Sequence, residues 1–200
     1  MIKVDFFVLK GVLKYLGRYH RKLLLVGTIC FLFSPVLRAQ NVAVKTNTLY
    51  WMAAGTMNAE VEFGLSRRTT FALSGLYNPW TFKDDRMMHL GAVQPELKYW
   101  FCERFEGHFV GLHVHGAQFF GDLLGFGDKR YDGWLAGAGL SWGYDWILST
   151  HWNMEFEVGY GINHAWYKET DCLPCVKSYV NRQKTFHSPT KIALSFAYLF

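Results

Sequence analysis

The sequence lacks an apolar stretch long enough for a membrane-spanning helix. The longest apolar run, 23–37, falls short of the roughly 20 residues that a helix needs to cross a bilayer, and Pro35 interrupts it near its end. No segment shows a clear helical period of apolar residues either. These absences argue against a helical membrane protein and against an ordinary helical domain.

An excess of basic residues is absent from most of the chain, although its formal net charge is +5. Seven of the 21 Lys and Arg residues and one of the 16 Asp and Glu residues lie in 1–39, so 40–200 carry a net charge of −1. The basic character therefore belongs to the first segment. Nothing in 40–200 indicates a nucleic-acid partner.

The first segment has the layout of a secretory signal peptide. Arg21 and Lys22 stand directly before the apolar run, and the small residue Ala39 follows it. This order predicts cleavage after Ala39, which gives a signal peptide at 1–39 and one domain at 40–200. The alternative is a membrane anchor that stays on the chain.

Aromatic residues and glycine are abundant in the remaining chain, and they occur in segments of alternating apolar and polar residues. Alternation with period two is typical of β-strands. Eight such segments follow one another, at 42–52, 58–65, 70–77, 89–101, 108–118, 132–146, 152–166 and 190–200. An even number of strands with one apolar and one polar face is typical of a transmembrane barrel. We therefore predict an all-β fold, an eight-stranded antiparallel transmembrane β-barrel.

The connections between these segments alternate in length. Those after the second, fourth and sixth segments are short, whereas three others are long, at 78–88, 120–131 and 167–188. Short periplasmic turns and long outer loops are typical of outer-membrane barrels, so we expect both chain ends in the periplasm and outer-membrane lipid around the barrel. A soluble eight-stranded barrel is the alternative, but it does not explain aromatic residues on the solvent face.

The last segment ends on an aromatic residue of its apolar face. Phe196, Tyr198 and Phe200 lie on this face. A terminal Phe in such a position resembles the carboxy-terminal signal that outer-membrane barrels present to the barrel-assembly machinery. We expect these three residues to serve as that signal.

Nine charged residues fall on the polar faces of the segments. Because each would cost several kcal/mol in lipid, we expect all of them to point into the barrel and to pair there. Eight strands leave no aqueous channel, which predicts a plugged polar core. Six acids face three bases, so either some carboxylates keep a proton or His113 and His115 become charged. The nine residues are Lys45, Glu60, Glu62, Glu96, Lys98, Asp145, Glu155, Glu157 and Lys191.

Three stretches resemble a known family. They are 131–144, which reads YDGWLAGAGLSWGY, together with 47–51 and 96–100. On these residues the chain resembles the outer-membrane barrel family called domain of unknown function 3575. Its members are often encoded beside genes for surface fimbriae, so the resemblance implies surface or fimbrial proteins as partners. The family has no assigned functional residues to carry over.

Cys172 and Cys175 lie in the longest predicted loop, in a compartment where thiols oxidise. A local disulfide is the plain interpretation. A thioredoxin-like role would need a βαβ unit that is absent from the pattern. A metal site with His164 and His187 does not fit common ligand spacings.

His113 and His115 share one strand face, an arrangement that can hold a metal but more often completes a hydrogen-bond network. We expect no metal and no cofactor.

A lipid-modifying enzyme acting on lipid A needs an adjacent hydroxyl and imidazole that reach the lipid. The close pairs in the sequence, at 187–188 and 150–151, lie in loops or turns. We therefore predict a non-catalytic envelope-structural or surface-interaction protein, with the lipid-modifying enzyme as the alternative.

Overall fold

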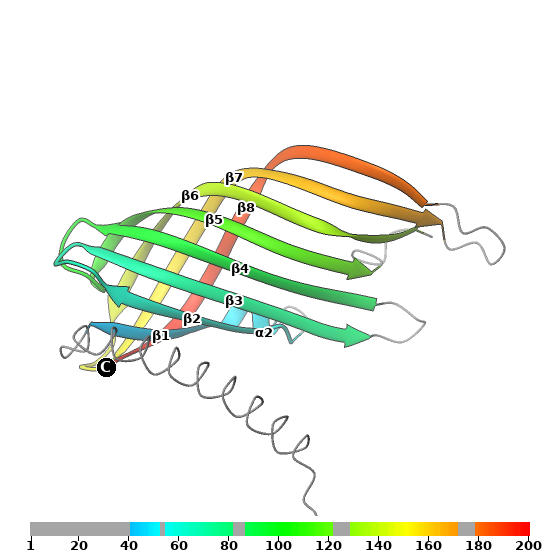
Figure 1. The fold of residues 1–200 in the computed structure, drawn as a ribbon. Coiled ribbons are helices and arrows are strands. Elements are labelled where there is room, and N and C mark those ends of the chain that lie inside the picture. The colour runs from blue at the N-terminus through cyan, green and yellow to red at the C-terminus, as the bar shows by residue number, and fades with distance from the viewer. Residues whose placement is uncertain (1–40, 53–54, 82–86, 122–128, 172–178) are drawn as a thin grey trace, which may run out of the picture. The chain divides into compact units, whose positions relative to one another are not determined.

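The computed structural model describes residues 41–52, 55–81, 87–121, 129–171 and 179–200. These residues form a closed antiparallel barrel in which each strand pairs with the next and β8 returns to β1 (Figure 1). The strands are β1 (Val42–Asn47), β2 (Met57–Gly64), β3 (Thr69–Thr81), β4 (Met87–Trp100), β5 (Gly107–Gly121), β6 (Lys129–Ile147), β7 (Trp152–Asp171) and β8 (Tyr179–Leu199). The predicted all-β, eight-stranded antiparallel barrel is confirmed.

Side chains alternate between a buried inner face and an exposed outer face. On β8, Lys191, Ala193 and Ala197 are buried, whereas Ile192 and Phe196 are exposed. The same alternation recurs around the barrel. Further large apolar side chains exposed on the outer face include Leu73, Val93, Leu97, Leu112, Val114, Leu140, Tyr160 and Ile162. The apolar residues thus lie outside, and the polar residues form the interior.

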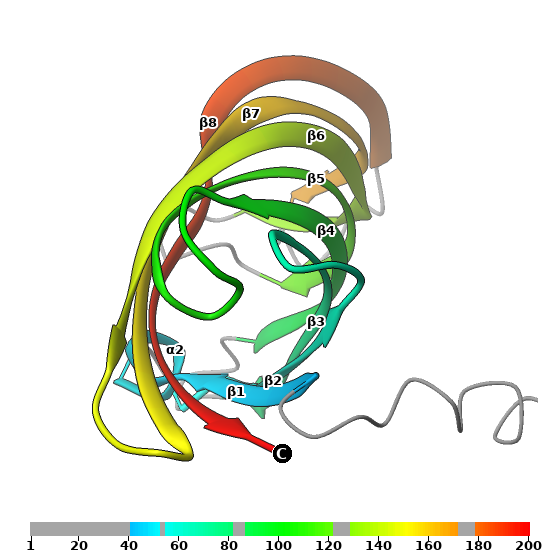
Figure 2. The ribbon, with the colours of Figure 1, turned by 90° about the vertical axis from the view of Figure 1, so that its left-hand side faces the viewer.

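The two ends of the barrel differ. Three short turns, at 65–68, 101–106 and 148–151, lie at the end that carries Phe200, which we call the turn end. Figure 2 looks onto this end, with the C-terminus in front. The strand ends that flank 82–86, 122–128 and 172–178 lie at the opposite end, which we call the far end (Figure 1). The first segment, 1–39, with its predicted signal peptide, lies outside the described residues.

Several predicted boundaries are wrong. The predicted loops 78–88 and 120–131 are strand at both ends, and two other differences are larger. The segment 42–52 is not one strand, because β1 ends at Asn47 and a short helix, α2 (Thr48–Met52), follows it. The predicted loop 167–188 is largely strand, since β7 and β8 stay paired as far as Thr170 and Tyr179. The far-end halves of β7 and β8 carry polar residues on both faces. The alternation of hydrophobicity therefore ends before the backbone pairing does.

No helix in the described ranges is long and apolar enough to cross a membrane.

Candidate functional site

The centre of the barrel holds the most unusual group of side chains, which we call the ion-pair core. The structure places all nine charged residues of the polar faces in the interior, each of them buried. They come from β1 (Lys45), β2 (Glu60, Glu62), β4 (Glu96, Lys98), β6 (Asp145), β7 (Glu155, Glu157) and β8 (Lys191).

Two of the lysines join strands across the interior. The Lys98 ammonium, fully buried, lies 2.9 Å from a Glu155 oxygen and 3.0 Å from a Glu157 oxygen. The Lys45 ammonium donates to Glu62 and Glu155. Because β4 and β1 are not neighbours of β7 in the sheet, these contacts join strands that share no backbone ladder.

Lys191 completes the core from β8. Its ammonium lies 2.9 Å from carboxylate oxygens of Glu60, Glu96 and Glu157. Glu96 also accepts a hydrogen bond from the Ser141 hydroxyl of β6. Charged groups that are buried this deeply are stable only when they are paired and hydrogen-bonded, and the three ammonium groups meet this condition.

The core has a spacing that would suit a cation, but a lysine fills it. Oxygens of Glu60, Glu155 and Glu157 lie within 4.8 Å of one another. The Lys98 ammonium lies within 3.5 Å of all three carboxylates. An ammonium group therefore supplies the positive charge that a metal would otherwise bring.

An aromatic cluster closes the interior on the turn-end side of the core. Trp100 lies with its ring centre 4.7 Å from that of Phe109 and 6.0 Å from that of Phe105. The Lys98 ammonium lies 4.4 Å from the Phe109 ring centre, a favourable cation–π contact. A Cβ on Gly143 would lie 2.3 Å from Phe109, so only glycine leaves room for this ring.

This aromatic cluster was not predicted. Trp100 and Phe109 fall on the polar face by simple counting from Lys98 and Gly111. Their position on that face was the signal that two aromatic residues point inward. Phe105 gave no such signal, because it lies in a turn.

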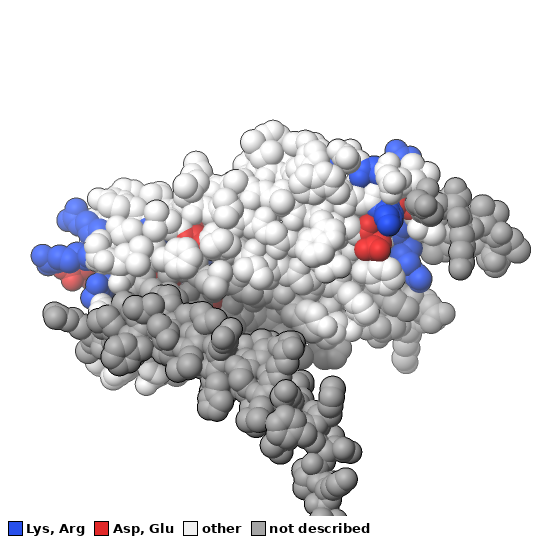
Figure 3. Space-filling view, viewed as in Figure 1, with Lys and Arg blue, Asp and Glu red and all other residues white. Residues whose placement is uncertain are grey.

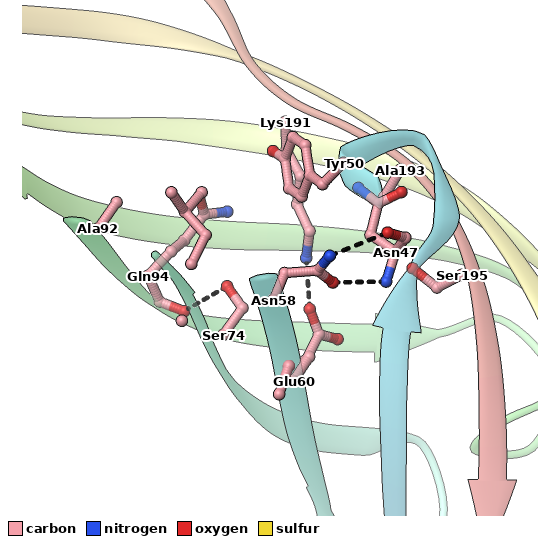
Figure 4. Close-up of a pocket in the computed structure, with 13 residues that line it drawn as sticks. Asn47, Tyr50, Asn58, Glu60, Ser74, Ala92, Gln94, Lys191, Ala193 and Ser195 are labelled. Carbon is pink, nitrogen blue, oxygen red and sulfur yellow. Dashed lines mark hydrogen bonds and ion pairs between the residues drawn. The ribbon is translucent and has the colours of Figure 1, made fainter. Parts of the chain in front are cut away.

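A small cavity lies on the far-end side of the ion-pair core, and Figure 4 shows its lining. Its volume is about 50 Å³, which has room for a few water molecules and not for a lipid chain. Lys191 and Glu60 line it as an ion pair, and Tyr50 of α2 lies beside Lys191. The Asn58 amide donates to the Asn47 carbonyl oxygen at 3.0 Å and accepts the Asn47 backbone N–H at 2.6 Å.

The two histidines on one strand face bind separate polar partners. His113 Nε2 lies 2.8 Å from the Thr190 hydroxyl, and His115 Nε2 lies 2.6 Å from the Asn163 amide oxygen. His113 Nδ1 lies 3.9 Å from a Glu96 oxygen. Both rings therefore belong to an interior polar network on the far-end side of the ion-pair core.

Asp145 stands apart from the other acids. Neither carboxylate oxygen has a hydrogen-bond partner within the described part of the chain, although the residue is buried. It faces Glu155 on the neighbouring strand. The ion-pair core therefore contains five engaged glutamates and one carboxylate without a hydrogen bond.

The remaining predicted residues lie on or near the surface. Tyr198 contacts Phe200 and Trp152 on the outer face, with ring centres 4.8 Å and 5.1 Å apart. Phe196 is also exposed on that face. Cys172 and Cys175 lie outside the described residues. Cys102, in a turn at the turn end, is a free and exposed thiol.

A hydroxyl and an imidazole do meet on the outer face, at a place that sequence spacing did not reveal. His164 Nδ1 lies 2.7 Å from the Thr185 hydroxyl, and its ring packs on Trp166 at 4.3 Å. A hydrolytic triad would also need a carboxylate to orient the imidazole. Within the described ranges, none contacts His164.

Together these features define a class of protein: an eight-stranded antiparallel barrel with an apolar exterior and an interior sealed by ion pairs and aromatic rings. Its sequence places it further. The chain belongs to the family described as Protein of unknown function (DUF3575), whose model matches residues 25–200. This confirms the resemblance seen at 131–144. No curated protein matches the chain.

Proposed function

We propose that the chain is a non-catalytic outer-membrane β-barrel with an envelope-structural or surface-interaction role. The observation that carries this proposal is the inverted distribution of polar and apolar side chains. Leu140, on the outer face, is 67% exposed, whereas Lys98 and Glu157, inside, are 0% exposed. Apolar side chains on the outer face are unfavourable in water, whereas they are favourable in contact with lipid chains.

The position of the aromatic residues supports the same surroundings. Trp152 lies near the turn end of β7 and Trp166 nearer its far end, both exposed on the outer face. A tilted strand covers roughly 35 Å along the barrel axis between them. This distance suits the two interfaces of a bilayer, where Trp side chains gather. In Figure 3 the charged side chains lie mainly at the two ends of the view, and uncharged residues lie between them.

Within the described residues, the ion-paired interior and the lack of a carboxylate beside His164 support a role other than transport or lipid hydrolysis. The cavity of about 50 Å³ is too small to conduct solutes. The His164–Thr185 pair has no carboxylate contact in the described residues. What the barrel offers to the outside is its far end, where strands β6, β7 and β8 extend beyond α2 (Figure 1). In a surface-interaction role, the partner contacts this far end of the barrel.

Fractionation and labelling of intact cells test the proposal. We expect the mature protein in outer-membrane fractions, beginning after Ala39 and migrating differently before and after heating. An impermeant maleimide should label a Gln183→Cys variant in the Cys102→Ser background, with Cys172 and Cys175 also replaced by Ser. The same reagent should leave Cys102 unlabelled on intact cells. Recovery from the soluble periplasm contradicts the membrane location, and labelling of Cys102 alone reverses the orientation.

A further inference from the structure

Strand β8 has a long edge that no neighbouring strand covers in the described part of the chain. β8 pairs with β7 along most of its length, as far as Tyr179. On its other side it pairs with β1 only between Ser195 and Leu199. No backbone hydrogen bond outside the strand ladders reaches 179–190 within the described residues. We call 179–190 the free edge of β8.

Hydrogen bonds from side chains end the backbone ladder between β1 and β8. The Asn47 amide donates to the Ile192 carbonyl oxygen at 3.1 Å and accepts the Leu194 N–H at 3.2 Å. The Thr48 hydroxyl donates to the Leu194 carbonyl oxygen at 2.7 Å. The chain then turns into α2, so β1 cannot continue along the free edge.

The chemical character of β8 changes where the free edge begins. From Ile192 onward, the outer-face residues are apolar, whereas Asn181, Gln183 and Thr185 are polar and exposed. Their neighbours Arg182 and Lys184, on the opposite face, are also exposed. The stretch 181–185 is thus polar and exposed on both faces, which fits neither lipid nor a packed interior. It fits a surface that meets water and another polypeptide.

The charge of the free edge indicates what kind of strand it accepts. It contains Arg182 and Lys184 and no acidic residue. Arg182 lies 2.7 Å from Glu169 of β7, whereas Lys184 makes no ion pair in the described ranges. Two basic residues at alternate positions suit acidic residues at alternate positions of an added strand. They also oppose pairing with a second copy of this chain, because like charges would meet.

We propose that the free edge of β8 is a strand-addition site for an extended, acidic segment of another polypeptide outside the cell. Backbone hydrogen bonds to an exposed sheet edge hold the added strand, and side-chain charge selects it. This inference rests on the proposed outer-membrane function and names its partner class. It also gives a reason for the extension of β6, β7 and β8 toward the far end.

Two synthetic peptides test the proposal with the purified, folded mature protein. One alternates glutamate with valine over twelve residues, and the other alternates lysine with valine. We expect the glutamate peptide to bind at least about tenfold more tightly at low salt, since charge complementarity selects partners. Hydrogen exchange should slow within 179–190 when this peptide is bound. The double variant Arg182→Glu/Lys184→Glu should reverse the preference.

A matched double variant at the turn end, Arg67→Glu/Arg68→Glu, changes the same charge away from the free edge and should leave binding unaltered. Equal binding of both peptides, no binding, or protection outside 179–190 overturns the proposal. Efficient cross-linking of two copies through a Thr185→Cys variant also overturns it, since the edge would then be covered by a second copy. Fractionation reports the membrane location separately, so a folded outer-membrane barrel that binds neither peptide refutes this inference alone.

Discussion

Lys98 is the residue whose loss the barrel should tolerate least. It is 0% exposed and lies 2.9 Å and 3.0 Å from carboxylate oxygens of Glu155 and Glu157. Lys98→Met keeps most of the volume but leaves buried carboxylates without their partner. We expect the free energy of unfolding to fall by about 3–5 kcal/mol. Urea titration of the protein in detergent micelles measures it, with the exposed Lys184→Met as control. Equal effects of the two substitutions would contradict the ion-pair core.

Asp145 should behave in the opposite way, because it has no hydrogen bond to lose within the described residues. Asp145→Asn removes a charge that faces Glu155 and keeps the shape of the side chain. We expect the free energy of unfolding to rise by about 1 kcal/mol or more, the scale of an unsatisfied buried polar group. Glu157→Gln is the matched comparison. It weakens contacts to Lys98 and Lys191 and should destabilise the barrel. A loss of stability on Asp145→Asn would show that this carboxylate is engaged.

At the scale of single elements, glycines decide how closely β6 can approach its neighbours. A Cβ on Gly143 would lie 2.3 Å from Phe109 and 2.5 Å from the Phe156 carbonyl oxygen. Gly143→Ala should therefore lower the free energy of unfolding by about 1–3 kcal/mol. Gly116→Ala on β5 is the control, because nothing lies within 4 Å of its added Cβ. If both substitutions were neutral in the same urea titration, the inward position of Phe109 would be wrong.

The sequence was sufficient to locate β6 and β7, because Trp, Tyr and Leu alternate there with Gly, Ser and Glu for more than ten residues. It was not sufficient for the far halves of β7 and β8. Lys168, Asn181 and Arg182 are polar whichever face they occupy, so hydrophobic alternation vanishes while backbone pairing continues. The end of β1 was also missed. It depends on hydrogen bonds from the Asn47 side chain to β8, which a local pattern cannot reveal.

For the interior charges, alternation predicts which residues point inward, but it does not predict how they pair. Counting along each strand places Lys98 and Glu155 on the inner face. Their pairing across the lumen follows from strand tilt and register, which bring β4 opposite β7. Alternation alone carries no information on either quantity. For the same reason, the separation of His113 from His115 into two hydrogen-bonded pairs could not be foreseen from their spacing.

At the scale of the whole described barrel, the usual relation between core and surface is reversed. Hydrophobic burial stabilises soluble domains, but among the described residues the large buried apolar side chains gather in one small cluster around Trp100 at the turn end. Most large apolar side chains lie on the outside. Ion pairs fill the centre, and the continuous backbone ladder closes the sheet. The proposed membrane location would supply apolar surroundings for this exterior.

Leu140 offers the sharpest test of those surroundings. It lies on the outer face of β6, midway in sequence between Trp134 and Trp146, and it is 67% exposed. In water, Leu140→Arg would change stability little, because the side chain already contacts solvent. In a bilayer, an arginine near the midplane should lower the free energy of unfolding by about 2–4 kcal/mol.

Reversible unfolding in lipid vesicles measures this difference. Ser149→Arg, in an exposed turn at the turn end, is the matched control and should cost little in either medium. A large effect of Leu140→Arg that appears only with lipid places the middle of β6 inside the bilayer. If Leu140→Arg is as mild as Ser149→Arg in vesicles, the outer face does not contact the hydrocarbon core. The apolar exterior would then have to be covered by protein, and the proposed membrane location would fall.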